Sequence, residues 1–303
     1  AALEMAEWGE QHGCVGLQVC EHHRSADGYL PAPLILASAF AARTQKTPIQ
    51  VAALILPLHD PVEMAEQMAV LDLVSGGRVS YVVAIGYVPA EYAMFGREMK
   101  GRRQRLEESV RVMQRLWRGE EFEYEGRRVK VTPLPHTPGG PFLMLGGGVP
   151  ATAKRAARLG LGVLAMGGDP EFEQRYQAAC RAEGREPGLC INPKPGVPLS
   201  VFVSRDPDTA WKKWGPHLLH DARAYAEWMG DAIESATKSL APDVDALRAE
   251  NGNYLIVTPD EAVALIREIG TLMLQPLCGG MPPEYAWESL ETLARDVLPR
   301  VGG

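Results

Sequence analysis

The chain has 303 residues, 46% hydrophobic and 23% charged, with a formal net charge of −7. An acidic balance argues against a nucleic-acid partner, because phosphates require a basic surface. The longest apolar run, residues 51–58, is too short to cross a bilayer, so we expect no membrane partner. Five cysteines without a CxxC pair, and a start without a basic-then-apolar leader, predict a reduced, cytoplasmic protein.

Helical and apolar stretches alternate along the first half of the chain. Residues 102–118 show this best, because Leu106, Val110, Met113 and Trp117 recur at spacings of three or four, which predicts an amphipathic helix. The remaining predicted helices of this half are residues 1–13, 32–44 and 60–77, and its predicted strands are residues 14–20, 49–57 and 79–86.

The second half continues the alternation. Its predicted strands are residues 141–148, 162–168, 197–204 and 271–277, and its predicted helices are residues 151–160, 169–184, 258–270 and 283–299. Four helices share one start signal, in which an oxygen-bearing side chain precedes a proline whose missing N–H costs nothing in the first turn. These pairs are Asp60-Pro61, Asp169-Pro170, Asp206-Pro207 and Thr258-Pro259.

Seven predicted strands, each followed by helical sequence, indicate parallel pairing and an α/β fold. An eighth strand before residue 1, where the sequence starts without a methionine, would complete a (β/α)8 TIM barrel. The rival doubly wound sheet lacks the GxGxxG turn that it requires. We therefore expect one barrel domain over residues 1–303. An insertion after the seventh barrel strand, residues 205–257, is either a helical lid or a packing appendage.

Glu21, His22 and His23 stand together where the first predicted strand ends. In a parallel barrel this end of the strands carries the functional residues. Zinc barrels usually separate two histidines by one residue so that both point the same way, whereas adjacent residues on a strand point to opposite sides. The pattern therefore does not favour a metal, even with His59 and Asp60 nearby. We expect His22 to face the mouth as an acid or base, and His23 to pack outward.

A second candidate site is the stretch LGGGVPATAK, residues 145–154. Glycines at a strand end allow a ligand to approach the backbone, and the following helix offers free N–H groups to a phosphate. A tight strand-to-helix turn is the alternative, although it requires fewer than three glycines.

Several stretches together resemble the bacterial luciferase-like superfamily. They are EHH at residues 21–23 and the segments 52–79, 85–96 and 103–117. The resemblance implies a TIM barrel that binds FMN or the deazaflavin coenzyme F420 at the carboxyl mouth of its strands. It covers most of residues 1–170.

Carried over by position, the resemblance makes His22 the active-site histidine. In the flavin enzyme that the resemblance implies, we expect Tyr87 to be a hydrogen-bond donor. Ala52 and Ala53 match a bulge in the third barrel strand, where a cis peptide often lies behind the flavin. Light-emitting members have Cys-Arg before the glycine at Gly86, whereas this chain has Ala84 and Ile85, so that arginine's phosphate contact is absent. The cofactor-binding residues implied are Ala52, Ala53, Gly86, Gly147, Gly148, Val149 and Thr152.

The resemblance implies a monooxygenase that uses O2 and reduced FMN, supplied by a separate flavin reductase, to oxygenate a small organic substrate. A homo- or heterodimer is expected. One alternative is an F420-dependent hydride-transfer enzyme, although deazaflavin-dependent sugar-phosphate dehydrogenases carry a glutamate near the position of Tyr87. Another is a flavin-binding protein without catalytic activity.

Overall fold

The computed structural model describes residues 1–303 except 167–168, 195, 231–234, 236 and 302–303. The described chain forms two compact units. The N-terminal unit comprises residues 3–25 and 29–193, and the C-terminal unit comprises residues 1–2, 26–28 and 194–303. Each unit is an α/β structure with parallel strands.

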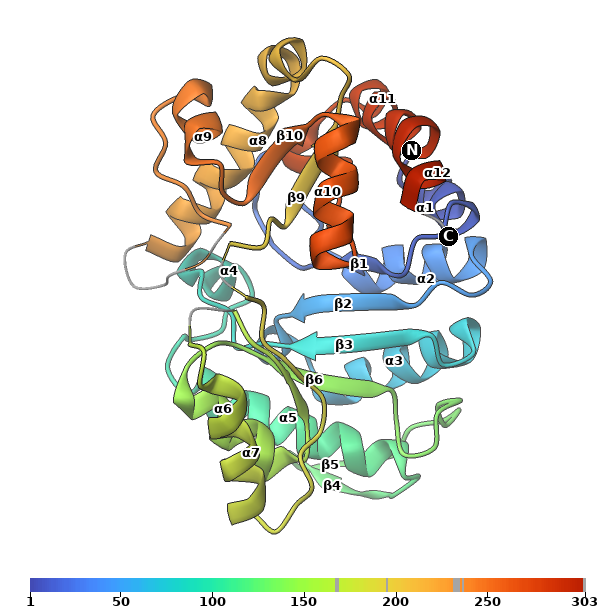
Figure 1. The fold of residues 1–303 in the computed structure, drawn as a ribbon. Coiled ribbons are helices and arrows are strands. Elements are labelled where there is room, and N and C mark those ends of the chain that lie inside the picture. Colours follow the sequence, from blue (N-terminus) through green and yellow to red (C-terminus); the bar gives the residue numbers. More distant parts are fainter. Residues whose placement is uncertain (167–168, 195, 231–234, 236, 302–303) are drawn as a thin grey trace. The chain divides into compact units, whose positions relative to one another are not determined.

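The N-terminal unit is built on a six-stranded sheet in the order β1-β2-β3-β6-β7-β8, and all of its pairings are parallel. Figure 1 shows β2, β3 and β6 side by side in this sheet. Parallel order follows from the helices that connect consecutive strands. The strands are β1 (Leu17–Val19), β2 (Ile49–Leu54), β3 (Val79–Val83), β6 (Phe142–Gly146), β7 (Gly162–Leu164) and β8 (Cys190–Ile191).

Helices between these strands bury the faces that their spacing predicts. Leu106, Val110, Met113 and Trp117 are all buried, and the Trp117 indole N–H donates to the carbonyl of Ala65 at 2.9 Å. This bond joins α5 to α3. The helices of the unit are α1 (Ala2–Gln11), α2 (Pro33–Arg43), η1 (Leu56–Leu58), α3 (Pro61–Ser75), α4 (Pro89–Met94), α5 (Arg102–Trp117), α6 (Pro150–Leu159) and α7 (Phe172–Ala182).

Residues 119–141 contain an antiparallel hairpin, β4 (Phe122–Tyr124) and β5 (Arg127–Val129). The guanidinium of Arg115 lies 3.6 Å from the centre of the Phe122 ring. Further along, the buried Asp72 carboxylate accepts the backbone N–H of Thr137 at 2.6 Å. Contacts from Asp72 of α3 and Arg115 of α5 therefore hold residues 119–141 in place.

The C-terminal unit contains β9 (Ser200–Val203) paired in parallel with β10 (Tyr254–Val257). Trp211 and Trp214 of the long helix between these strands are buried against Phe202 and Tyr254. The helices of the unit are α8 (Pro207–Met229), α9 (Val244–Glu250), α10 (Pro259–Ile269), η3 (Cys278–Gly280), α11 (Pro283–Thr292), η4 (Leu293–Val297) and α12 (Leu298–Val301).

Two predictions for this unit require correction. The predicted insertion 205–257 is helical in α8 and α9, but it ends in β10, and residues 231–234 and 236 lie outside the described residues. The four apolar residues of β10 are too few to show a period. Residues 271–277 are not a strand, although Met273 accepts the backbone N–H of Val201 at 2.9 Å. It stays a prediction that residues 1–303 form a single domain in which residues 205–257 act as a lid.

Three of the four predicted helix starts are confirmed. The side chains of Asp60, Asp206 and Thr258 each accept backbone N–H groups in the first turn, with a proline following. The fourth is wrong by two residues, because α7 begins at Phe172. Asp169 instead accepts the N–H of Glu171 at 2.9 Å in the turn before that helix.

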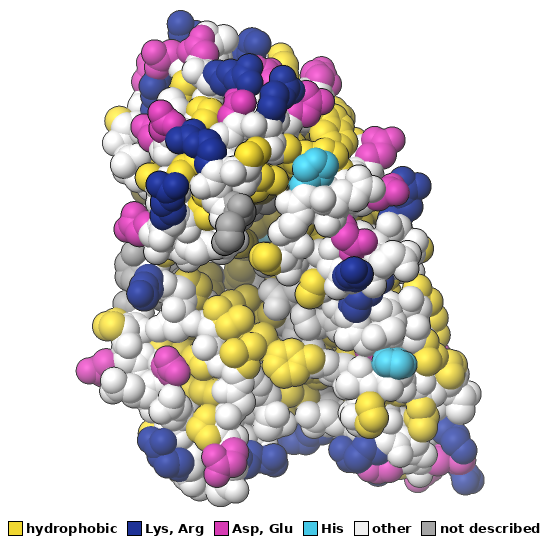
Figure 2. All heavy atoms as spheres, turned by 45° about the vertical axis from the view of Figure 1, so that its right-hand side comes forward, with side chains coloured by type: hydrophobic (Ala, Val, Ile, Leu, Met, Phe, Trp, Pro, Cys, Tyr) yellow, Lys and Arg dark blue, Asp and Glu magenta, His cyan; other side chains and the backbone are white. Residues whose placement is uncertain are grey.

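Among the residues described, no helix combines the length and apolar composition that crossing a membrane requires. On the face drawn in Figure 2, Lys and Arg side chains are interspersed with Asp and Glu side chains. That face therefore shows no extended basic patch of the kind that binds nucleic acids.

Candidate active site

Glu21, His22 and His23 follow β1 after one residue, Cys20, and are buried, each at most 6% exposed. They belong to the N-terminal unit, and the backbone N–H of His22 donates to the carbonyl of Leu30 at 3.2 Å. Burial of three titratable side chains is costly unless each finds a partner. These partners come from the segments that follow β2 and β3 and from the loop itself.

The His22 ring lies between a carboxylate and a phenol. Its Nδ1 is 3.0 Å from Glu91 Oε1, and its Nε2 is 3.4 Å from the Tyr87 hydroxyl. The ring of Tyr29 meets it edge-on, with centroids 5.1 Å apart. Burial, together with the charges of Glu91 and Cys20, raises the pKa of Tyr87. The Tyr87 hydroxyl therefore stays protonated and available as a donor.

Glu91 lies in the short helix α4 that follows β3, and it is 1% exposed. Its Oε1 accepts the backbone N–H of His23 at 2.9 Å as well as the contact from His22. Its Oε2 is buried and has no hydrogen-bond partner among the described residues. Glu91 therefore joins α4 to the loop after β1.

Glu21 is a second buried carboxylate, with several donors. Its Oε1 lies 2.9 Å from His23 Nε2 and 2.7 Å from His59 Nε2, and its Oε2 accepts the N–H of Ile55 at 2.5 Å. Burial opposes ionisation, but the hydrogen bonds from His23, His59 and Ile55 outweigh it and lower the pKa of Glu21 to about 2. In the described part of the chain, no group of three or more His, Cys, Asp or Glu side chains is arranged to hold a metal ion.

The two adjacent histidines thus have different partners. His23 contacts Glu21, and its ring packs edge-on against Phe95 with centroids 4.7 Å apart. His22 contacts Glu91 and Tyr87. That His22 faces the mouth while His23 packs outward stays a prediction.

The peptide bond between Ala52 and Ala53 is cis, and the pairing of β2 with β3 shifts register between Ala52 and Leu54. The prediction of a cis or bulged bond is confirmed. Ala52 packs with Val82 and Met144, with Ala53 and Leu164 at the margin of the group. The functional role of this bulge stays a prediction.

Gly86 has a structural reason to be glycine. Its φ is +65°, and a Cβ there would lie 2.6 Å from Ile55 Cγ2. The neighbouring Ile85 carbonyl accepts the Tyr92 hydroxyl at 2.5 Å. The end of β3 is therefore packed against the segment that Glu21 holds.

The predicted phosphate turn connects β6 to α6. Gly147 has φ +134°, and a Cβ there would lie 2.9 Å from the buried hydroxyl oxygen of Thr152. Helix α6 begins at Pro150, and its N-cap, Val149, is exposed and provides no side-chain cap. Gly148 lies between them in the turn. The turn at residues 147–149 therefore requires glycine at position 147.

The sequence pattern does not identify Glu91 as a site residue, nor the contact between Glu21 and His59. The available signal was position, because Glu91 follows the end of β3, on the same edge of the sheet as the end of β1. An acidic residue in the first turn of a helix has a simpler use at the helix dipole, so its sequence context alone does not identify it.

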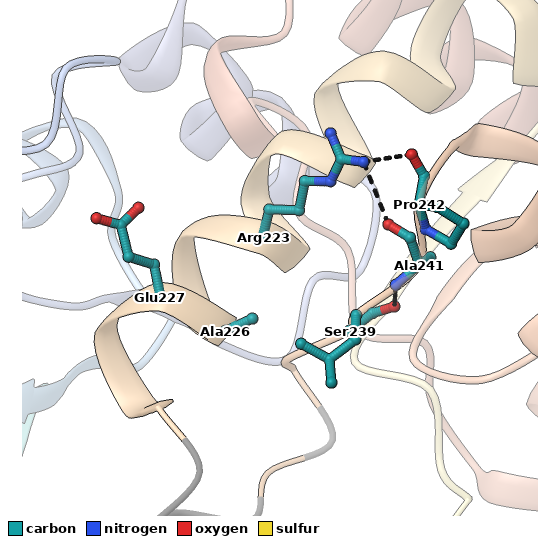
Figure 3. Close-up of a pocket in the computed structure, with 7 residues that line it drawn as sticks. Arg223, Ala226, Glu227, Ser239, Ala241 and Pro242 are labelled. Carbon is teal, nitrogen blue, oxygen red and sulfur yellow. Dashed lines mark hydrogen bonds between the residues drawn. The ribbon is translucent and has the colours of Figure 1, made fainter.

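Surface hollows in the C-terminal unit lie at other residues. One, of about 370 Å³, is lined by α8 and residues 239–242 (Figure 3). There the Arg223 guanidinium donates to the carbonyls of Ala241, at 3.3 Å, and Pro242. Another is lined by residues of α8 and α11 with their flanking residues. Neither includes a predicted site residue.

A family model described as luciferase-like monooxygenase matches residues 1–274. The chain belongs to this family. The luciferase-like family therefore accounts for both units, since the match extends through β10 and α10. The resemblance seen in the sequence is confirmed.

Luciferase-like relatives of two chemical kinds match nearly the whole chain. The 4-hydroxyprotoasukamycin monooxygenase of Streptomyces nodosus subsp. asukaensis is 25% identical over 327 residues, covering 99% of this chain and 86% of that protein. The F420-dependent glucose-6-phosphate dehydrogenase of Mycobacterium avium is 27% identical over 322 residues, covering 99% and 93%. Monooxygenase RslO1 from Streptomyces bottropensis has a similar structure, with a TM-score of 0.75 at 26% identity, covering 98% and 92%. These relatives are oxidoreductases by name.

Proposed function

We propose that this luciferase-like protein is a flavin-dependent monooxygenase that uses reduced FMN and O2 to oxygenate a small organic substrate. The observation that carries the proposal is the buried His22 ring, held between Glu91 and Tyr87 beside the carboxyl ends of β1 and β3. Ligands of parallel α/β proteins bind at this end of the strands. The family match supports the choice of chemistry.

The residues present fit a flavin. Gly147, where a Cβ would lie only 2.9 Å from the hydroxyl oxygen of Thr152, keeps the turn free of a side chain, and the start of α6, which has no side-chain cap, suits a phosphate. Ala52 and Ala53, at the β2 bulge, carry small side chains, and a flat ring would pack against this part of the strand. Gly147, Gly148, Val149 and Thr152 would hold the phosphate, with Ala52, Ala53 and Gly86 near the ring. When bound, reduced FMN supplies the reaction with O2.

The chain's own groups would manage protons and exclude water. His22 Nε2 would accept or return a proton at the substrate, as a histidine does near neutral pH. Tyr87 would donate a hydrogen bond, because its raised pKa keeps the hydroxyl protonated. The buried setting of His22 strengthens each of these interactions.

A second candidate is an F420-dependent oxidoreductase that transfers hydride on the same fold. It is favoured by the dehydrogenase from Mycobacterium avium, which matches 99% of this chain. The same turn at residues 147–149 and the same histidine, His22, would serve either coenzyme. A flavin-binding protein without activity is the third candidate, and the closely partnered His22 argues against it.

The same proposal extends to architecture and partners. The parallel strands would belong to one (β/α)8 barrel, which the TM-score of 0.75 with monooxygenase RslO1 supports. A separate flavin reductase would supply reduced FMN, and the protein would act as a homo- or heterodimer in the cytoplasm.

Oxygen uptake by the purified protein tests the proposal. Reduced FMN and reduced F420 are supplied in parallel, with a panel of small organic acceptors and product analysis. A substrate that gains an oxygen atom with FMN supports the monooxygenase. Hydride transfer with F420, without oxygen uptake, supports the second candidate. Failure of both coenzymes to bind contradicts both.

A further inference from the structure

We infer that Glu91 is the positioning residue for His22: it holds the ring with the proton on Nδ1, so that Nε2 presents its lone pair on the side of Tyr87. This inference rests on the proposed function for its kinetic consequence. The proton position itself can be measured without a coenzyme.

The contacts fix which atom carries the proton. Glu91 Oε1 already accepts the backbone N–H of His23 at 2.9 Å, so this oxygen acts as an acceptor. The 3.0 Å contact with His22 Nδ1 then requires a donor on the ring, which is Nδ1–H. In a neutral imidazole the other nitrogen is left as an acceptor. Tyr87, at 3.4 Å, can donate to it.

Burial makes this arrangement specific. Glu91 is 1% exposed, and it belongs to a helix distant in sequence from the loop of His22. Its Oε2 is buried without a hydrogen-bond partner among the described residues, so the contacts of this carboxylate with His22 and His23 both lie on Oε1. By accepting from one ring nitrogen through Oε1, the carboxylate fixes the tautomer of an acid–base histidine.

Other charged and titratable groups near this pair have partners of their own. Glu21 is bound to His23, His59 and Ile55. Cys20 Sγ lies 2.8 Å from the Tyr29 hydroxyl. Glu91 Oε1, at 3.0 Å, is a partner of His22 Nδ1.

The test is the ¹⁵N spectrum of the histidine rings in protein without coenzyme, recorded at the alkaline end of a pH series, where the ring signals no longer change with pH. The His22 signals are assigned by their loss in His22→Asn. We expect Nδ1 to be protonated and Nε2 to be unprotonated. A wild-type ring protonated on Nε2 overturns the inference outright, whatever the variants do.

Variants at Glu91 separate positioning from a merely structural role. Glu91→Leu removes the acceptor, and we expect the ring to shift toward the Nε2–H form. Glu91→Gln keeps an acceptor oxygen but loses the charge, so the Nδ1–H form should persist with its proton resonance moved upfield. Asp72→Asn is the matched control, because it removes a buried carboxylate that binds Thr137 instead. An unmoved Nδ1 proton in Glu91→Gln contradicts the inference even if Glu91→Leu fails to fold.

Kinetics complete the test. Glu91→Leu should lower kcat by a factor approaching the roughly 10²–10⁴ expected for losing His22, with KM and coenzyme affinity unchanged. Glu91→Gln should restore part of the rate, and Asp72→Asn should keep the wild-type kcat. A protein with the expected tautomer but no activity with either coenzyme would retain the positioning role and refute the proposed function. Loss of coenzyme binding in Glu91→Gln would refute the positioning role.

Discussion

The Glu21 carboxylate accepts the backbone N–H of Ile55 at 2.5 Å and so ties the loop after β1 to the end of β2. Its other oxygen lies within hydrogen-bond distance of the rings of His23 and His59. Ile55 in turn packs where a side chain at Gly86 would stand. One carboxylate therefore organises the ends of β1 and β2 and supports the end of β3 through Ile55.

Glu21→Ala should lower the free energy of unfolding by about 3–5 kcal/mol, because it leaves several buried donors without their acceptor. Glu21→Gln keeps one acceptor oxygen and should cost about 1–3 kcal/mol. Urea unfolding measures both. The exposed Glu66→Gln on α3 serves as the control and should stay within about 0.5 kcal/mol of wild type. A Glu21→Ala variant with the wild-type free energy of unfolding would contradict the organising role of Glu21.

Lowering the pH should remove the contribution of Glu21 to the free energy of unfolding over a defined pH range. Its pKa is lowered from 4.5 to about 2 in the folded protein. Because the folded pKa lies below the unfolded one, this stabilisation is complete above about pH 4.5 and is lost as the pH falls toward 2. Between about pH 6 and pH 3, wild type should lose about 1–2 kcal/mol more free energy of unfolding than Glu21→Gln. Equal losses of unfolding free energy in wild type and Glu21→Gln would contradict a lowered pKa for Glu21.

The two histidines should respond differently to removal. His22→Ala should lower turnover by roughly 10²–10⁴-fold, the range for losing an acid or base, with coenzyme affinity largely intact. His23→Ala should act mainly on stability, by about 1–3 kcal/mol, because Glu21 loses a buried donor. Steady-state kinetics and thermal melts on both variants test this. The reverse pattern, with His23 essential for turnover and His22 dispensable, would show that the roles are exchanged.

Gly147→Ala should weaken coenzyme binding by about tenfold or more, which corresponds to about 1.4 kcal/mol. The new Cβ would lie 2.9 Å from Thr152 Oγ1, at a φ of +134° that side chains rarely adopt. The matched control is Gly184→Ala, which also has a positive φ of +66° but open space around it. Fluorescence titration with the coenzyme measures both affinities. Equal effects of the two changes would mean that the turn is structural alone.

Tyr87→Phe should lower kcat by about tenfold, the effect of one lost hydrogen bond of about 1.4 kcal/mol. Because burial raises the pKa of Tyr87, wild-type activity should show no alkaline decline from this hydroxyl below about pH 10. Tyr124→Phe, in the β4–β5 hairpin, is the control and should leave kcat unchanged. A Tyr87→Phe enzyme with full kcat would remove Tyr87 from the site.

Local patterns in the sequence determined most of the secondary structure. The helical face that includes Leu106 and Met113 follows from spacing alone, and the caps at Asp60 and Thr258 follow from short-range hydrogen bonding. The bulge at Ala52 and Ala53 was predicted through family resemblance. Elements too short for a period were missed, as with β8 and β10.

The partners within the candidate site were decided by tertiary structure. His22 and Glu91 are 69 positions apart, and Glu21 and His59 are 38 apart. They meet because parallel pairing brings the carboxyl ends of β1, β2 and β3 to one edge of the sheet. The sequence alone determined that a carboxylate and two histidines stand at a strand end. Which histidine each carboxylate binds depends on strand order and register, because hydrogen bonds act over about 3 Å while the chain between the partners runs through whole helices.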